Sequence, residues 1–273
     1  MTFEANYGFN NEIIAVAKAA WYGLETNQTL VFPRKVDWML TRFDLRFLFS
    51  AFGFVVEEDI PPNGTMTRFT QNMFYRHIRN IDRNRWFNFR AAFLGLVFCC
   101  PTKFLAESVE RVKREVLGGM QYVGLHVRNI NPSSMRWEGR IRALYRNEFQ
   151  KGPAMVRLNG PRGNSTWDMS PEYVANQLAV HGLSNATVFL GHDRQSHDMV
   201  ERLMGAAQLK VVQATPVSYP ELLGDMDSLL VDMLVLMDSS LFIGNEGSTV
   251  PWNIISLRRA RGQLWDNILG PDH

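Results

Sequence analysis

The second half of this sequence alternates short apolar runs with longer segments of helical character, and that alternation constrains the fold most. The apolar runs predict buried strands at residues 122–127, 187–191, 210–212 and 241–243. The intervening segments predict helices at residues 170–181, 196–205, 219–237 and 250–259. Strands that alternate with helices form parallel sheets, because each connection carries the chain back to the same edge. The second half therefore predicts an α/β fold with a doubly wound parallel sheet.

The first half opens with part of the same order. A glycine and asparagine turn, Gly8-Phe9-Asn10-Asn11, precedes residues 12–26, whose apolar positions have helical spacing. Asn10 or Asn11 would cap that helix. Buried strands are expected at residues 29–32, where Pro33 ends the run, and at residues 54–56. Turn, helix and strand together predict one half of a Rossmann-like unit.

The middle of the chain separates two domains. Residues 71–88 are dense in arginine and aromatic side chains without a clear period, which predicts irregular structure or short helices. A helix expected at residues 105–117 ends at Gly118-Gly119. We therefore expect an N-terminal domain over residues 1–118 and a C-terminal domain over residues 119–273.

Composition excludes several classes of protein. The 273 residues are 46% hydrophobic and 21% charged, and their net charge is +2. That balance leaves no excess of cations for binding nucleic acid by bulk electrostatics. No basic segment followed by an apolar core marks a signal peptide, and no apolar run is long enough for a membrane span. These features predict a cytoplasmic protein without a membrane span, with a secretory location left open if the chain is a fragment.

The two cysteines, Cys99 and Cys100, are adjacent and follow the apolar run that starts at Leu94. Neighbouring cysteines bond to each other only with strain, and they lack the spacing of a metal site. We expect buried structural thiols. Low cysteine content fits a reducing compartment.

Polar side chains stand at the carboxyl ends of the predicted parallel strands, where open α/β sheets bind ligands. Arg128 follows the strand at residues 122–127, Asp193 follows the strand at 187–191, and Ser248 and Thr249 come after the last strand. Arginine matches phosphate bidentately, and hydroxyls at a helix N-terminus favour anions. An ordinary salt bridge at Arg128 and ordinary helix capping at Ser248 or Thr249 are the alternatives. Together the residues suit a diphosphate.

One carboxylate interrupts an apolar helix. Asp232 lies within the run Leu229–Met237, where a buried carboxylate needs a donor or faces a site. A ribose or guanine edge would suit it. Asp225-Met226-Asp227 has the letters of a metal diphosphate site, but its place at a helix start favours capping, and we identify no metal ligands. Motifs of dinucleotide oxidoreductases, P-loop NTPases and α/β-hydrolases are absent from the sequence.

Four of these segments, in this order, resemble motifs of the O-fucosyltransferase superfamily. The opening turn, helix and strand are similar to that superfamily's start, and Gly124-Leu125-His126-Val127-Arg128 is similar to its H-x-R motif. Residues 186–196, ATVFLGHDRQS, resemble its strand that ends in aspartate. Residues 232–249, DMLVLMDSSLFIGNEGST, resemble the donor-site segment of the protein O-fucosyltransferases.

The resemblance implies a GT-B architecture, in which two Rossmann-like domains with parallel sheets face a cleft and the C-terminal domain holds the donor. It also implies an inverting, metal-independent transfer of L-fucose from GDP-fucose to a hydroxyl of a glycan or protein. No cofactor beyond this donor substrate is implied.

Roles for individual residues follow from the same resemblance. Arg128 would contact the β-phosphate and the leaving oxygen, and Asn10 or Asn11 would lie beside the fucose and pyrophosphate. Asp232 would meet the guanine. The other residues expected to bind the donor are Gly8, Phe9, His126, Asp193, Ser248 and Thr249.

Two departures keep alternatives open. Tyr7 stands where some members place a glutamate as base, and Asn129-Ile130-Asn131 replace the charged residues that often follow the H-x-R motif. One alternative is a transferase for another nucleotide sugar, such as a rhamnose or xylose donor. The other is a catalytically inactive protein that binds nucleotide sugars or carbohydrates.

Overall fold

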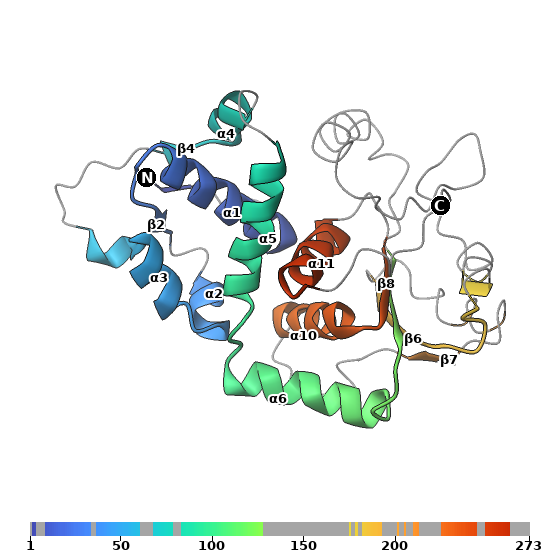
Figure 1. Cartoon of the computed structure of the whole chain (residues 1–273). Helices are drawn as coiled ribbons and strands as arrows, with labels where there is room; N and C mark the ends of the chain where they lie inside the picture. Colours follow the sequence, from blue (N-terminus) through green and yellow to red (C-terminus); the bar gives the residue numbers. More distant parts are fainter. Residues whose placement is uncertain are drawn as a thin grey trace. The chain divides into compact units, whose positions relative to one another are not determined.

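The computed structural model describes residues 2–3, 9–33, 37–60, 68–78, 83–127, 175, 178–179, 182–192, 201, 205, 210–212, 225–244 and 249–262. The chain forms two compact units (Figure 1). Unit 1 comprises Met1–Ala106 and Arg259–Gly262, and unit 2 comprises Glu107–Arg258 and Gln263–His273. The division falls within a helix that precedes Gly118-Gly119.

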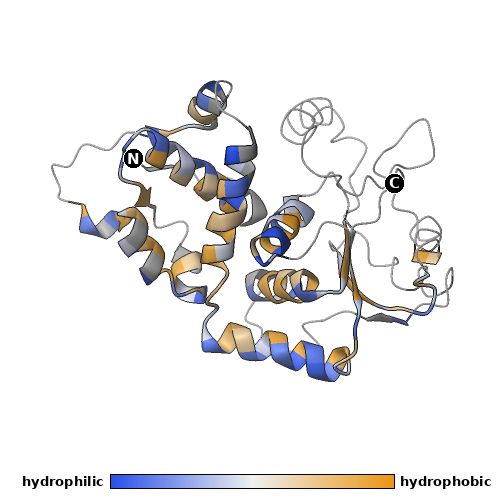
Figure 2. Ribbon diagram, in the orientation of Figure 1, coloured by the Kyte–Doolittle hydropathy of each residue, from blue (hydrophilic) through white to orange (hydrophobic). Residues whose placement is uncertain are grey.

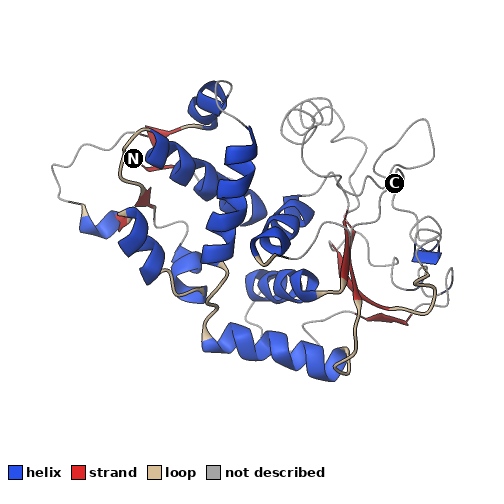
Figure 3. Ribbon diagram, in the orientation of Figure 1, coloured by secondary structure: helices blue, strands red, loops and turns tan. Residues whose placement is uncertain are grey.

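Unit 1 consists of helices around short parallel strands (Figure 3). Its strands pair two by two, β1 with β4 and β2 with β3, and both pairs are parallel. The elements are β1 (Thr2–Phe3), α1 (Phe9–Glu25), β2 (Val31–Phe32), α2 (Asp37–Arg42), α3 (Arg46–Phe52), β3 (Val55–Val56), a 3-10 turn (Glu57–Asp59), β4 (Arg68–Phe69), α4 (Gln71–Ile78) and α5 (Arg83–Val97).

Aromatic side chains form much of the core of unit 1. Trp21 of α1 packs edge-on against Trp86 of α5 at 6.1 Å between ring centroids, and it contacts Phe89 at 4.9 Å. Phe32 at the end of β2 contacts Phe54, beside β3, at 5.6 Å. Offset and edge-on contacts of this kind add stability beyond the apolar area that they bury. The helix and strands predicted for residues 12–56 are therefore held by aromatic packing.

The start of α1 differs from the expectation. The helix begins at Phe9, so Asn10 and Asn11 lie inside its first turn and neither is the residue that precedes and caps it. The segment 71–88, expected to be irregular or to form short helices, contains α4 and the first part of α5. The aromatic contacts of Trp86 and Phe89 explain why α5 forms without a clear apolar period.

The cysteine prediction is wrong. Both Cys99 and Cys100 are exposed. Helix α5 ends at Val97, and the chain then bends so that Phe98 is buried while the next two residues face solvent. The apolar run therefore passes from the buried core at Phe98 to the surface at Cys99, the next residue.

Unit 2 is built around a four-stranded parallel sheet of order β7-β6-β5-β8. The unit's elements are the later part of α6 (Lys103–Arg111), a π-helical turn (Val112–Val116), β5 (Val123–Val127), β6 (Thr187–His192), β7 (Lys210–Val212), α10 (Asp225–Asp238), β8 (Leu241–Gly244) and α11 (Thr249–Ala260). The predicted strands are confirmed, and so is the last helix, with bounds shifted by one or two residues. The helix predicted at 219–237 is confirmed from Asp225 on, and residues 219–224 lie outside the described residues. The helices predicted at 170–181 and 196–205 lie mostly outside the described residues.

Apolar side chains fill both faces of this sheet, as its continuous apolar runs predict. Leu125 of β5, Val188 of β6 and Ile243 of β8 are buried on one face. Phe189 of β6 and Phe242 of β8 are buried on the other. Figure 2 shows α10 as a mainly hydrophobic helix, and its residues Leu230–Met237 are nearly all buried. In the described part of the chain, no helix is long and apolar enough to cross a membrane.

Candidate functional site

The candidate site lies at the carboxyl edge of the sheet in unit 2, where His126 has glycine on both sides. His126 is level with Gly191 of β6 and with Gly244 of β8 in the register of the parallel strands. Its imidazole is 6% exposed and lies over Gly191, 3.7 Å from where a Cβ atom would be at that residue. Side chains that are level on adjacent parallel strands share one face. Because glycine has no side chain, Gly191 and Gly244 leave room on this face of the sheet for the His126 imidazole and for the helices that pack there.

Helix α10 covers this face. A Cβ atom at Gly191 would be 2.9 Å from Leu236 Cδ1, and one at Gly124 would be 2.6 Å from Ser239 Oγ. Ser239 therefore packs on Gly124, and Leu236, one turn earlier in α10, packs on Gly191. Gly191 is nearer the carboxyl edge of the sheet, so α10 runs away from that edge. Asp232 lies one turn further in the same direction, so it approaches the edge beyond the row of His126.

Asp232 is the exception in a buried helix. Between Leu230 and Met237 it alone keeps an intermediate exposure, and its neighbours along the helix are all buried. Burial raises the pKa of its carboxyl from 3.8 to about 8. A carboxyl group in this setting favours its protonated form at neutral pH until a donor or cation approaches it. Asp232 thus places a polar group in the part of α10 that approaches the carboxyl edge.

The N-terminus of α11 lies at the same edge. Helix α11 begins at Thr249, which is partly exposed, and Pro251 lies in its first turn. Proline is tolerated there because a first-turn N–H has no partner within the helix. A Cβ atom at Gly244 would be 2.6 Å from Pro251 Cβ, so the first turn of α11 packs closely on the row that contains His126. Free N–H groups and the Thr249 hydroxyl at this point suit an anion.

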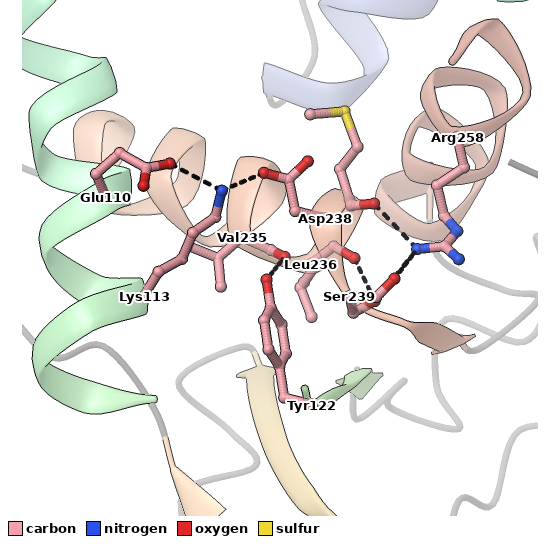
Figure 4. Close-up of polar contacts among 9 residues, drawn as sticks. Glu110, Lys113, Tyr122, Val235, Leu236, Asp238, Ser239 and Arg258 are labelled. Atoms are coloured by element: carbon pink, nitrogen blue, oxygen red, sulfur yellow. Dashed lines mark hydrogen bonds and ion pairs between the residues drawn. The ribbon is translucent and has the colours of Figure 1, made fainter. Parts of the chain in front are cut away.

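The opposite end of α10 is fixed by polar contacts (Figure 4). The Tyr122 hydroxyl donates to Val235 O at 2.7 Å. The Lys113 ammonium donates to Glu110 at 3.0 Å and also contacts the Asp238 carboxylate. Burial lowers the pKa of Lys113, but these hydrogen bonds outweigh it and leave that pKa raised. The sheet and the π-helical turn are thereby both joined to the C-terminal part of α10.

Arg258 completes this anchor from α11. Its guanidinium is 4% exposed and donates to Met237 O at 3.0 Å and to Ser239 O at 2.5 Å. The last carbonyls of a helix lack partners within the helix, and a cation at that end also complements the helix dipole. Arg258 therefore joins the C-terminal end of α10 to α11. These hydrogen bonds fix the positions of the two helices that carry Asp232 and Thr249. The sequence signals this residue only weakly, as a charge among the apolar residues of α11.

The described residues contain only part of the predicted site. His126, Asp232 and Thr249 belong to three elements of unit 2 that meet at or approach one edge of the sheet. Phe9, Asn10 and Asn11 lie in the first turn of α1 in unit 1, so their contribution to a common site stays a prediction. Four predicted residues lie outside the described residues, namely Gly8, Arg128, Asp193 and Ser248.

Possible metal ligands are sparse among the described residues. No group of three or more histidine, cysteine, aspartate or glutamate side chains is placed to hold a metal ion within the described ranges. Asp225 and Asp227 both lie in the first turn of α10, and Asp227 is fully buried. They lie at a helix start, as the sequence predicts, but both are inside the first turn, and neither is the residue that precedes and caps the helix. Metal independence stays a prediction.

Comparisons with known proteins connect this geometry to a fold. Protein-family models give no match, and neither do curated protein sequences. POFUT1 in complex with GDP has a TM-score of 0.59 and 10% identity, over 96% of this chain and 95% of that chain. POFUT1 in complex with GDP-fucose has a TM-score of 0.55 and 10% identity, over 94% and 92% of the two chains. Fucosyltransferase NodZ from Bradyrhizobium has a TM-score of 0.46 and 14% identity, over 93% and 92%.

The two POFUT1 structures cover nearly the whole chain, so their likeness concerns the full architecture and not one unit alone. The α/β fold class is confirmed by the parallel sheets and by this likeness. The resemblance of the sequence motifs to the O-fucosyltransferases is confirmed at the level of the fold. The chain therefore has an O-fucosyltransferase-like fold of the GT-B type.

Proposed function

We propose that this protein is a glycosyltransferase that moves L-fucose from GDP-fucose to a hydroxyl group of a glycan or protein. One observation carries the proposal. In a chain with the fold of a protein crystallised with GDP-fucose, an aspartate within a buried helix, a histidine between glycines and a helix N-terminus lie toward one edge of the sheet in unit 2. Carboxyl edges of parallel sheets are where such folds bind nucleotides.

The residues divide between the two ends of the donor. The N-terminus of α11 with Thr249, together with Ser248 and Arg128, would bind the diphosphate through hydroxyls, N–H groups and a guanidinium. Asp232 would accept hydrogen bonds from N–H groups of guanine. His126 would support the strand end that leads to Arg128. Gly8, Phe9 and Asp193 would complete the donor contacts, as the motif resemblance implies.

Arg128 would act on the transition state. As the bond between fucose and the diphosphate breaks, negative charge grows on the leaving oxygen, and a fixed cation there lowers the barrier. Asn10 or Asn11 would contact the fucose and pyrophosphate, and attack by the acceptor from the opposite side of the sugar would invert the configuration. Because arginine, hydroxyls and N–H groups supply the counter-charge, we propose that no divalent cation takes part.

The direct test measures binding and turnover separately. Thermal-shift measurements with GDP, UDP and GDP-fucose should give greater stabilisation by GDP than by UDP, and Asp232→Asn should reduce that preference. Transfer or slow hydrolysis of GDP-fucose by the wild type should fall about 10²–10³-fold in Arg128→Ala. Wild-type turnover by a folded Arg128→Ala protein would contradict the proposal.

The raised pKa of Asp232 gives a second signature of the guanine contact. If the ionised carboxylate accepts hydrogen bonds from GDP, affinity for GDP should increase as the pH rises from 6 to 8, because the apo carboxyl has a pKa of about 8. Asp232→Asn should bind GDP with little dependence on pH over this range. Equal pH dependence in both proteins would remove Asp232 from the site. Tight binding of GDP-fucose with neither transfer nor hydrolysis would indicate a binding protein instead.

A further inference from the structure

The bend between α5 and α6 carries both cysteines of the chain. Cys99 and Cys100 are the two cysteines of the sequence, and both are exposed with free thiols. Their Sγ atoms lie 2.6 Å apart. That separation is longer than the S–S bond of a disulfide, which is about 2.05 Å, and it places the two sulfur atoms in direct contact. The two thiols therefore face each other at the surface of unit 1.

Backbone contacts hold this bend in place. The N–H of Asp44 donates to Cys100 O at 2.9 Å, and the N–H of Thr102 donates to Arg42 O at 2.9 Å. Between these bonds, Pro101 forms an antiparallel bridge with Phe43. The bend is thus attached on both sides to the segment between α2 and α3. Its backbone keeps the cysteine side chains together and directed outward.

The two thiols act as a coupled pair. Partial desolvation of its sulfur, the hydrogen bond with Cys100 and the nearby Asp44 carboxylate raise the pKa of Cys99 to about 11. The thiolate is the nucleophile in disulfide exchange. Whichever sulfur loses its proton first attacks a reagent, and the other sulfur lies in direct contact with it and can attack in turn.

We propose that Cys99 and Cys100 form a redox modification site, at which a small disulfide of the glutathione class converts the two thiols reversibly into a vicinal disulfide. The thiolate of one cysteine attacks the small disulfide, forming a mixed disulfide and releasing one thiolate. The sulfur of the neighbouring cysteine then attacks the protein sulfur of that mixed disulfide and releases the second thiolate. The protons from Cys99 and Cys100 end on the two released thiols, so the protein loses two electrons and the reagent gains them.

The covalent geometry makes this modification reversible. Consecutive Cα atoms are about 3.8 Å apart, whereas the Cα atoms of a disulfide are usually about 4.4–6.8 Å apart. A disulfide between neighbours is therefore strained, and strained or exposed disulfides are the readily reduced ones. The pair thus acts as a switchable site and not as a structural crosslink. The site lies in unit 1, and it does not depend on the proposed transfer reaction.

The test uses the full chain with oxidised glutathione as the probe. Intact-mass measurement should show loss of two hydrogens from the wild type, with both titratable thiols lost and without a stable glutathione adduct. Cys99→Ser and Cys100→Ser should each retain one glutathionyl group instead. Wild type that keeps both thiols, accumulates a mixed disulfide or forms a disulfide-linked dimer would overturn the proposal.

A second probe tests the thiol pair without oxidation. Phenylarsine oxide condenses with two adjacent thiols, forming two As–S bonds and releasing water. Wild type should bind one equivalent, resistant to a large excess of a monothiol and released by a dithiol. Each serine variant should lose this resistant binding entirely. Equal binding by wild type and both variants would show that the thiols do not act as a pair.

Discussion

Replacing Asp232 by asparagine should stabilise the protein increasingly as the pH rises. The carboxyl has a folded-state pKa of about 8 against an ordinary value of 3.8, so the folded chain holds a proton that the unfolded chain releases between these values. Linkage then makes the free energy of unfolding of the wild type fall as the pH increases through this window. The amide of Asp232→Asn does not titrate and resembles the protonated acid in shape. The variant therefore escapes this loss.

The magnitude follows from the number of protons involved. One proton difference changes the free energy of unfolding by about 1.4 kcal/mol per pH unit, or about 3 kcal/mol between pH 5 and pH 7. Asp232 keeps part of its surface in solvent, so these values are upper limits. Below pH 4 the two proteins should be equally stable. Above pH 8 the carboxyl is ionised in both states, and the difference should stop growing.

Urea unfolding at pH 5, 6, 7 and 8 measures this difference directly. Asp44→Asn is the matched control, because hydrogen bonds from Arg46 lower the pKa of Asp44 to about 2. Its stabilising effect is complete above the ordinary pKa of 3.8 and is lost only as the pH falls toward 2, so Asp44→Asn should differ from wild type by a constant amount across this range. A wild-type advantage or deficit against Asp232→Asn that stays constant from pH 5 to 8 would refute the burial of this carboxyl.

Three further changes test the support of the site and its metal requirement. Gly244→Ala should lower the free energy of unfolding by about 1–3 kcal/mol, because the new Cβ atom would be 2.6 Å from Pro251 Cβ. Gly205→Ala is the control in thermal unfolding: its Cβ atom would meet nothing within 4 Å, so its stability should be close to that of the wild type. Arg258→Met should lower the free energy of unfolding by about 2–4 kcal/mol, because the carbonyls of Met237 and Ser239 lose the guanidinium that donates to them. An unchanged midpoint in urea unfolding would contradict this role of Arg258. Sugar transfer should persist in EDTA, and loss of transfer that Mn²⁺ restores would contradict the metal-independent proposal.

The sheet of unit 2 is predictable from sequence because a parallel strand buried on both faces is a continuous apolar run. Residues 210–212 and 241–243 become β7 and β8 almost without change. Helix α5 is harder to predict, since arginines and aromatics share its surface without a helical period. Its formation depends on Trp86 and Phe89 packing against Trp21 of α1, a contact between residues far apart in the chain. Periodicity within one segment carries no information about such a partner.

The candidate site shows the same division. Asp232 is a candidate from sequence because a carboxylate inside an apolar helix needs a hydrogen-bond donor or a ligand, and its role in a site stays a prediction. Arg258 could not be predicted, because its acceptors are backbone carbonyls that exist in any sequence. The exposure of Cys99 and Cys100 could not be predicted from sequence either, because hydropathy assigns them to the apolar run that includes the buried Phe98.

The glycines beside His126 are explained by packing and do not require a role in binding. Gly191 and Gly244 are required by contacts with Leu236 and Pro251, so packing alone accounts for them. That packing brings α10 and the first turn of α11 close to the carboxyl edge of the sheet, where side chains follow the glycine row. A phosphate or guanine contact then requires only a few polar groups, because the short distances between helix and strand already fix their positions. In the proposed transferase, residues beyond this row would distinguish the sugar and the acceptor, because packing leaves those residues free to differ between proteins of one fold.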